Sequence, residues 1–158
     1  MTLLNRKTDY TLLILTHLHR HPSGENARSI ADRYELSRPF TANILKELCR
    51  KGLVSSSRGV KGGYSLNAHT NALNLAELMR SIDDEFELTV CSGSEDPTIE
   101  HEACNLADVC PVRSPLNEVH RRVLDVFRSV TLNELFGEAP KPAPVRNLVP
   151  LLTTTSRG

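Results

Sequence analysis

Three of the four cysteines in this 158-residue chain fall within one short, acidic segment. Cys91, Cys104 and Cys110 follow one another in C-x12-C-x5-C order. Thiolates this close in sequence are soft ligands that suit iron–sulfur clusters, zinc or copper(I). The lack of a C-x-x-C pair argues against a zinc knuckle or a thioredoxin-like redox motif. The spacing therefore indicates a metal site, with three unligated thiols as the alternative.

The surroundings of the cysteines limit the other kinds of chemistry. No cysteine lies beside a recognisable His/acid pair, and no glycine-rich phosphate loop precedes a helix, so we do not expect an enzyme. The chain starts without a secretory pattern, and its apolar run 10–18 is too short to span a bilayer. We therefore expect a cytoplasmic protein with no membrane partner, in which the thiols stay reduced. Cys49 lies apart, and we expect it to pack within a helix.

The elements that must position these cysteines begin with a basic, helical first half. Apolar spacing predicts helices over 5–20 and 27–34, and a third helix opens at Ser37 with Pro39 in its first turn. Two helices joined by a tight turn form a helix-turn-helix pattern. Residues 1–66 contain eleven Lys/Arg against five Asp/Glu. A charge of this sign suits DNA, although segregation on solvated faces is the plainer alternative.

A glycine-rich hairpin follows the third helix. Strands are predicted over 53–57 and 64–66, and the tip between them contains Arg58, Lys61 and three glycines. Glycines permit close backbone approach, and the two cations suit phosphates or a minor groove. Directly after a helix-turn-helix, this hairpin is typical of a wing. The predicted fold class is thus mainly α with a small β-hairpin wing: a winged helix-turn-helix plus a long helix.

That long helix is predicted to start at Ser114-Pro115, by the preference for an N-cap Ser and a first-turn Pro. Its apolar residues recur in steps of three and four, as in the a/d seam of a coiled coil; they are Leu116, Val119, Val123, Val126 and Val130. Packing on its own domain is one explanation. Because the first half already looks self-contained, we favour pairing with the same helix of a second chain, which makes a homodimer.

The chain accordingly divides into four parts. Residues 1–87 form a winged helix-turn-helix DNA-binding domain, and 88–112 form a cysteine-rich loop without sustained periodicity. Residues 113–136 form the dimerisation helix and a short last helix. The Pro-rich, polar end, 137–158, is expected to be a mobile tail.

The combination resembles the iron–sulfur winged-helix regulators of the IscR, NsrR and RirA type, and NsrR most of all. The likeness covers about residues 1–136. Its matching motifs are Lys7-Thr8-Asp9-Tyr10, Leu36-Ser37, Lys51-Gly52-Leu53-Val54, the R-G-x-x-G-G-Y wing at 58–64, the cysteine triad and Thr131-Leu-x-Glu134-Leu135.

The resemblance implies a homodimer that binds a partly palindromic operator. Recognition helices enter two major grooves and wings reach the neighbouring minor grooves. The positions that fall where the family contacts DNA are Ser37, Arg38 and Thr41 on the third helix and Arg58 and Lys61 on the wing.

The resemblance also implies a four-iron or two-iron cluster on Cys91, Cys104 and Cys110. In NsrR-type members the fourth ligand is an aspartate near the start of the other subunit's chain, and Asp9 matches it; His101, inside the loop, competes for that role. The family's first two cysteines are usually five to seven residues apart, whereas twelve intervene here. The extra residues either loop out or alter the site.

These expectations together predict a transcription regulator, acting as a repressor, that senses nitric oxide, iron or redox state through the cluster. The alternative is a winged-helix regulator whose cysteine loop binds zinc or acts as a thiol redox switch without a cluster.

Overall fold

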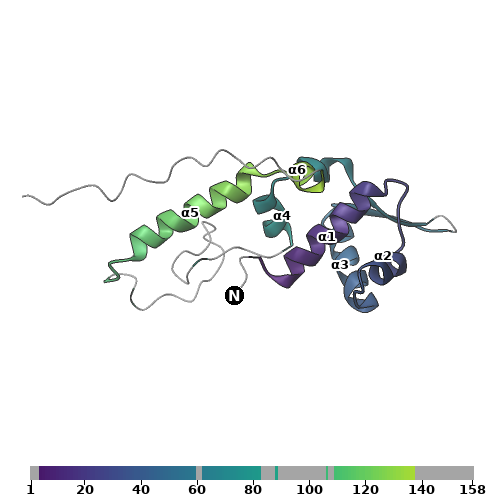
Figure 1. Cartoon of the computed structure of the whole chain (residues 1–158), viewed down its shortest axis with the longest axis horizontal. Helices are drawn as coiled ribbons and strands as arrows, with labels where there is room; N and C mark the ends of the chain where they lie inside the picture. The colour runs from purple at the N-terminus through teal and green to yellow at the C-terminus, as the bar shows by residue number, and fades with distance from the viewer. Residues whose placement is uncertain (1–3, 60–61, 83–87, 89–105, 107–108, 138–158) are drawn as a thin grey trace, which may run out of the picture.

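The computed structural model describes residues 4–59, 62–82, 88, 106 and 109–137. Its elements are α1 (Arg6–Arg20), α2 (Ala27–Arg33), α3 (Arg38–Arg50), β1 (Val54–Ser57), β2 (Gly63–Leu66), the 3-10 helix η1 (Ala68–Ala72), α4 (Leu75–Ser81), α5 (Arg113–Ser129) and α6 (Leu132–Phe136). Figure 1 shows the predicted class, a mainly helical chain with one hairpin and one long helix, which is confirmed. Within these residues no helix is both long and apolar enough to cross a bilayer.

Helix α1 runs through the centre of the reading head, our name for residues 4–82. Asn5 caps it by accepting a hydrogen bond from the backbone N–H of Thr8 at 2.9 Å. Its buried face contributes Ile14, Leu15 and Leu18 to a core that it shares with α2, α3, β1, α4 and α6. Since each of the three side chains has no exposed surface, burial of this face contributes to the head's stability.

The turn between α2 and α3 is made by a non-glycine residue in the left-handed region. Glu35 has φ +54°, and the N–H of Leu36 donates to the carbonyl of Ala31 at 2.9 Å. This pattern ends α2 and sends the chain directly into α3. Ser37 occupies the predicted N-cap position, but its side chain makes no capping hydrogen bond.

Helix α3 ends at a glycine and leads straight into the wing. Gly52 has φ +75°, and the N–H groups of Gly52 and Leu53 donate to the carbonyls of Cys49 and Leu48. The antiparallel strands β1 and β2 then pair from Val54 opposite Leu66 to Ser57 opposite Gly63. Both strands fall within one residue of the predicted spans.

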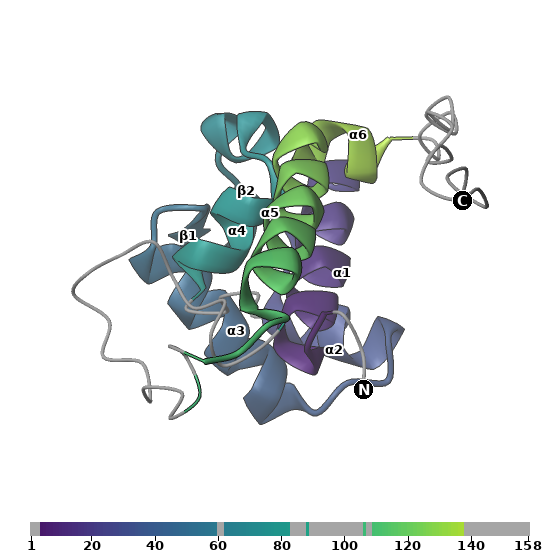
Figure 2. The ribbon, with the colours of Figure 1, turned by 90° about the vertical axis from the view of Figure 1, so that its left-hand side faces the viewer.

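Helix α5 is attached to the head near its C-terminal end. The N–H of Leu75 donates to the carbonyl of Val130 at 3.0 Å, and that of Leu132 donates to the carbonyl of Leu73 at 2.8 Å. Phe127 packs beside Leu75 and Met79 in a second, smaller core. Figures 1 and 2 show α5 lying against α4 with its N-terminal end extending away from the head.

The start of α5 differs slightly from the prediction. The helix begins at Arg113 with Val112 as its N-cap and no capping side chain, instead of at a Ser114 cap. Pro115 is still accommodated, because the N–H groups of a helix's first turn have no partner within the helix. η1 was not predicted, because its single turn leaves no periodic pattern in the sequence.

Candidate nucleic-acid interface and cysteine site

In the helix-turn-helix, one side of α3 faces solvent. Its buried side consists of Thr41, Ile44, Leu45 and Leu48. At 100° per residue, Asn43, Lys46 and Arg50 lie on the opposite side, and all three are exposed. Sequence reasoning missed these three side chains, although the apolar positions of the same helix already placed them opposite the core.

Arg38, at the first turn of α3, is held by an acid from α2. Its Nε donates to Asp32 Oδ1 at 3.0 Å and its Nη2 donates to Oδ2 at 3.2 Å, a two-point contact. Both side chains remain more than half exposed. The pair therefore orients the guanidinium at the N-terminal end of α3 and leaves it exposed to solvent.

Thr41 requires a correction. The sequence placed it among the DNA-contacting residues, but it is completely buried, and its hydroxyl lacks a hydrogen-bond partner among the described residues. The reason is the helical phase: Thr41 lies on the side of α3 that carries Ile44 and Leu48. A side chain in that position supports the packing of the helix and does not reach a base, so we omit it from the proposed contacts.

The wing presents an exposed cation beside a turn whose backbone conformation requires glycine. Arg58 is exposed, and Gly59 has φ +114°. A Cβ on Gly62 would lie 2.5 Å from the carbonyl oxygen of Ser57, so no larger residue fits there. Lys61, the second predicted wing cation, lies outside the described residues.

The cysteine site is only partly visible. Cys110 is a partly buried, free thiol three residues before α5, and Asp9 is exposed on α1. Cys91, Cys104 and the competing ligand His101 lie outside the described residues. Figure 1 shows the start of α5 well apart from α1 along the long axis of the molecule. Nothing in the described part of one chain brings Asp9 and Cys110 together.

Cys49 behaves as a structural residue. It is half-buried on α3 and packs against the main core. Burial raises the pKa of its thiol, which opposes formation of the thiolate that metals and oxidants require. The sequence predicted that Cys49 packs within a helix, apart from the other cysteines, and this environment agrees with that prediction.

One side chain joins α1, α3 and the end of α4. The Nζ of Lys7 donates to Glu47 Oε1 at 2.9 Å and to the backbone carbonyl of Ile82 at 2.6 Å. Ile82 is the last described residue before the segment that leads to the cysteines. Lys7 thus connects the beginning of that segment to the helix that carries Asn43 and Lys46.

A helix-turn-helix whose second helix exposes polar and basic side chains, followed by a glycine-turned β-hairpin with a basic tip, defines a winged-helix DNA-binding protein. The family model described as Rrf2, iron-dependent transcriptional regulator, matches residues 4–138, so the chain belongs to the Rrf2 family. It is a DNA-binding transcription regulator and not an enzyme, and the resemblance to the NsrR and IscR types is confirmed.

Two kinds of relative are similar in sequence. The HTH-type transcriptional regulator NsrR of Bacillus licheniformis is 31% identical over 134 residues, which cover 84% of this chain and 90% of the relative. The regulator IscR of Pectobacterium atrosepticum is 26% identical over 125 residues, covering 79% and 72% respectively.

Among solved structures, CymR, the global cysteine regulator of B. subtilis, is similar with a TM-score of 0.63 and 25% identity, over 86% of this chain and 97% of that one. The IscR of T. potens shares the fold with a TM-score of 0.59 and 22% identity, over 84% of both chains.

Proposed function

We propose that this protein is a cytoplasmic, homodimeric repressor that senses nitric oxide, iron or redox state through an iron–sulfur cluster in its cysteine loop. The observation that carries the proposal is the combination of a winged helix-turn-helix with a free thiol, Cys110, three residues before a largely uncovered helix. The iron-dependent description of the family and the likeness to NsrR and IscR support the choice of cofactor.

The DNA contacts are proposed from exposure and charge. Ser37 and Arg38 stand at the first turn of α3, and Arg58 stands at the wing. The N-terminal end of a recognition helix is the part that meets base edges and phosphates in this class. To these we add Asn43 and Lys46, which share the solvent side of α3. Lys61 stays in the set as the second wing cation.

The dimer is proposed from α5. Val119 and Val126 are 47% and 59% exposed, and Val112, one heptad earlier, is 53% exposed. Val119 and Val126 lie on one side of the helix, in line with the N-cap residue Val112. The partly buried Leu116 and Val123 lie between them, so that together they form an apolar strip. Pairing this strip with its symmetry copy would bury it and set the spacing of two recognition helices.

The cluster ligands are proposed as Cys91, Cys104 and Cys110 of one chain with Asp9 of the other. The two donors that the structure describes fit this role, because Cys110 is free and Asp9 is exposed with no hydrogen bond to its carboxylate among the described residues. When bound, a cluster supplies an iron centre that reacts with nitric oxide and oxidants. The resemblance to NsrR-type regulators is the reason to assign Asp9 to the partner, and the separation of the α5 start from α1 within one chain supports that assignment.

Lys7 offers a route from that ligand to the DNA surface. It lies two residues before Asp9 on α1 and contacts Glu47 on α3. We expect a displacement of the start of α1, caused by a change at the cluster, to move the recognition helix as well. The ion pair of Lys7 and the core that the two helices share would transmit it. We expect the cluster-bound dimer to bind its operator and the cluster-free dimer to release it.

The DNA surface is tested by salt-dependent binding to a palindromic operator selected from random duplexes. Lys46→Ala should reduce the slope of log affinity against log salt by about one, as the loss of one phosphate contact requires. Arg128→Ala, a change of the same charge on the exposed side of α5, is the matched control and should leave the slope unchanged. Equal slopes for Lys46→Ala and wild type would exclude Lys46 from the contact.

The cluster is tested on anaerobically purified full-length protein by iron and sulfide analysis together with operator affinity. Cys110→Ala should lose iron, sulfide and repression, whereas Cys49→Ala should keep all three. Asp9→Ala and His101→Ala compared in the same assays identify the fourth ligand. If the protein contains zinc and no iron or sulfide, the zinc alternative replaces the cluster. If thiol oxidants release metal-free protein from the operator, the thiol-switch alternative replaces it. Neither result would affect the DNA-binding assignment.

A further inference from the structure

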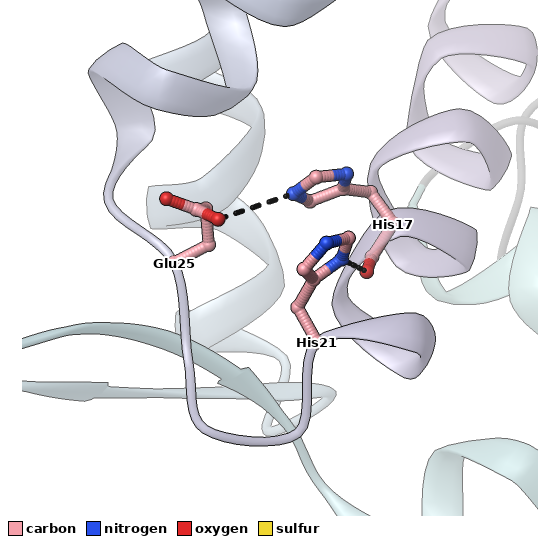
Figure 3. A group of neighbouring side chains, drawn as sticks. All are labelled: His17, His21 and Glu25. Carbon is pink, nitrogen blue, oxygen red and sulfur yellow. Dashed lines mark hydrogen bonds and ion pairs between the residues drawn. The ribbon is translucent and has the colours of Figure 1, made fainter.

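Three side chains outside the cysteine loop gather where α1 meets the wing. His17 and His21 lie at and just after the end of α1, and Glu25 lies in the loop that leads to α2. One candidate ligand atom from each residue lies within 4.8 Å of the other two. Figure 3 shows the carboxylate of Glu25 facing the two imidazole rings, which stack with centroids 4.1 Å apart.

The tautomer of His21 is fixed by its hydrogen bond. Its Nδ1 lies 2.7 Å from the backbone carbonyl oxygen of His17. A carbonyl only accepts, so Nδ1 carries the proton and Nε2 of the neutral ring has a free lone pair. A backbone carbonyl on the second ring nitrogen is the usual support of a metal-ligating histidine.

His17 has a buried ring nitrogen, Nε2, that lies near the Glu25 carboxylate but makes no hydrogen bond within the described part of the chain. The side chain is 2% exposed, and its Nδ1 lies 3.0 Å from the hydroxyl of Tyr34. Its Nε2 has no hydrogen-bond partner among the described residues, and the nearest carboxylate oxygen, of Glu25, is 3.7 Å away. Burial and the neighbouring His21 lower the pKa of His17, which favours the neutral ring that a metal requires.

The position of Glu25 links this cluster to the DNA-binding wing. Its backbone N–H and carbonyl exchange hydrogen bonds of 3.0 and 2.8 Å with Tyr64 of β2. A Cβ on Gly63 would lie 2.8 Å from the Glu25 backbone, so the loop and β2 are in closest possible contact. A ligand that holds the Glu25 side chain would therefore also restrain the base of the wing.

We propose that His17, His21 and Glu25 form a second metal site, independent of the cysteine loop, that takes a divalent zinc ion and braces the wing against α1. Two imidazoles and one carboxylate match a zinc site with one position left for water. Bonds of about 2.0–2.2 Å require the three donors to approach by roughly 1 Å. Side-chain rotation of Glu25, which is only partly buried, contributes to that approach.

The test is zinc content and cobalt spectroscopy on the full-length chain and on a variant with Cys91, Cys104 and Cys110 changed to alanine. Cobalt(II) is the probe, because thiolate ligands give intense near-ultraviolet charge-transfer bands that nitrogen and oxygen ligands do not give. We expect one equivalent of zinc, or of cobalt without these bands, in the variant lacking the loop cysteines.

In that background Glu25→Gln and His21→Ala should each lose the equivalent, and His19→Ala should keep it. His19 is the matched control, because it lies on the same helix and its Nδ1 pairs with Asn71 at 3.0 Å. Tyr34→Phe should weaken binding by about 10–100-fold through loss of support to His17.

Zinc content unchanged by Glu25→Gln, or no zinc retained at micromolar free metal, would overturn the proposal. Glu25→Gln decides if His21→Ala fails to fold, because it preserves the size of the side chain. The outcome is independent of the proposed iron–sulfur cluster, since no loop cysteine takes part.

Discussion

Helices α1 and α5 are similar in length but differ in what they bury. Six of the fifteen residues of α1 are buried, against one, Phe127, of the seventeen in α5. Leu15 of α1 has no exposed surface, whereas Val126 of α5 is 59% exposed. The reading head therefore completes its core within one chain. Helix α5 offers an apolar strip that one chain leaves uncovered.

The charged, exposed side of α5 adds local support to a helix that one chain buries only in part. Arg121 bonds Glu118 and Asp125 at 2.8 Å, and Arg122 bonds Glu118 at 2.8 Å. Hydrogen bonds from Arg121 and Arg122 lower the pKa of Glu118 to about 2. Such pairs at three- and four-residue spacing support an isolated helix modestly and leave its other side free for a partner.

The contrast is tested most strongly by removing one large side chain from each helix. Leu15→Ala should lower the free energy of unfolding by about 2–5 kcal/mol, because it leaves a cavity in a closed core. Val119→Ala should cost less than about 1 kcal/mol at protein concentrations where the chain is monomeric. Urea denaturation of both variants gives the values, and similar losses would show that α5 is as fully packed within one chain as α1.

Charging the apolar strip should separate the two chains without unfolding them. In Val119→Glu with Val126→Glu, like charges face each other across the proposed dimer, and operator affinity should fall about 100-fold, or roughly 2.7 kcal/mol. Sedimentation equilibrium should show a monomer with an unchanged circular dichroism spectrum. Arg121→Gln, on the opposite side of α5, serves as control and should remain dimeric. A dimeric double variant would place the subunit contact elsewhere.

Acid should weaken the reading head through His17. Its folded pKa is lowered below the unfolded value, so the unfolded chain takes up the proton first as the pH falls. Stability is complete above the unfolded pKa, near 6.5. It should decline below that pH by at most about 1.4 kcal/mol per pH unit until the folded pKa is passed. Denaturation from pH 7.5 to 5 in the presence of a chelator, for wild type, His17→Gln and the control His69→Gln, measures this slope. A slope that survives in His17→Gln must come from another group.

The smallest expected effect is at the turn of the helix-turn-helix. Glu35→Gly should raise stability by up to about 1 kcal/mol, because glycine adopts the positive φ of this residue without strain. Part of the gain is offset by the greater freedom of glycine in the unfolded chain. Thermal melting compared with Glu35→Ala, which should show no gain, provides the measurement. A lower melting temperature for Glu35→Gly would mean that the side chain makes stabilising contacts.

Local rules explain how much of the fold was predictable. The apolar periodicity predicted α1, α2 and α3, and Gly52, of the residue type that commonly ends helices, lies just past the end of α3. Asn74 and Thr131 each form a capping box with the glutamate three residues later, a pattern that is visible in the sequence. Each of these signals acts over four residues or fewer, so one sequence is sufficient to find them.

The sites were less predictable because they depend on which side of a helix meets the core. Thr41 was assigned to DNA and is buried, while Asn43 and Lys46 were missed and are exposed. The phase of α3 could have separated them. The contact between Arg38 and Asp32 could not be inferred, because it needs the angle between α2 and α3.

The sequence by itself determined the order of the elements, the basic reading head, the wing and the apolar strip of α5, because these follow from composition and from short periods along the chain. Only the tertiary structure decided that His17, His21 and Glu25 meet at the base of the wing and that Lys7 joins α1 to α3 and α4. The physical reason is that packing against distant segments sets the geometry of these side chains. The loop of Glu25 is held by Tyr64 of β2, and Lys7 is held by Glu47 and Ile82, so the four-residue spacing from His17 to His21 to Glu25 does not by itself fix how the three side chains meet.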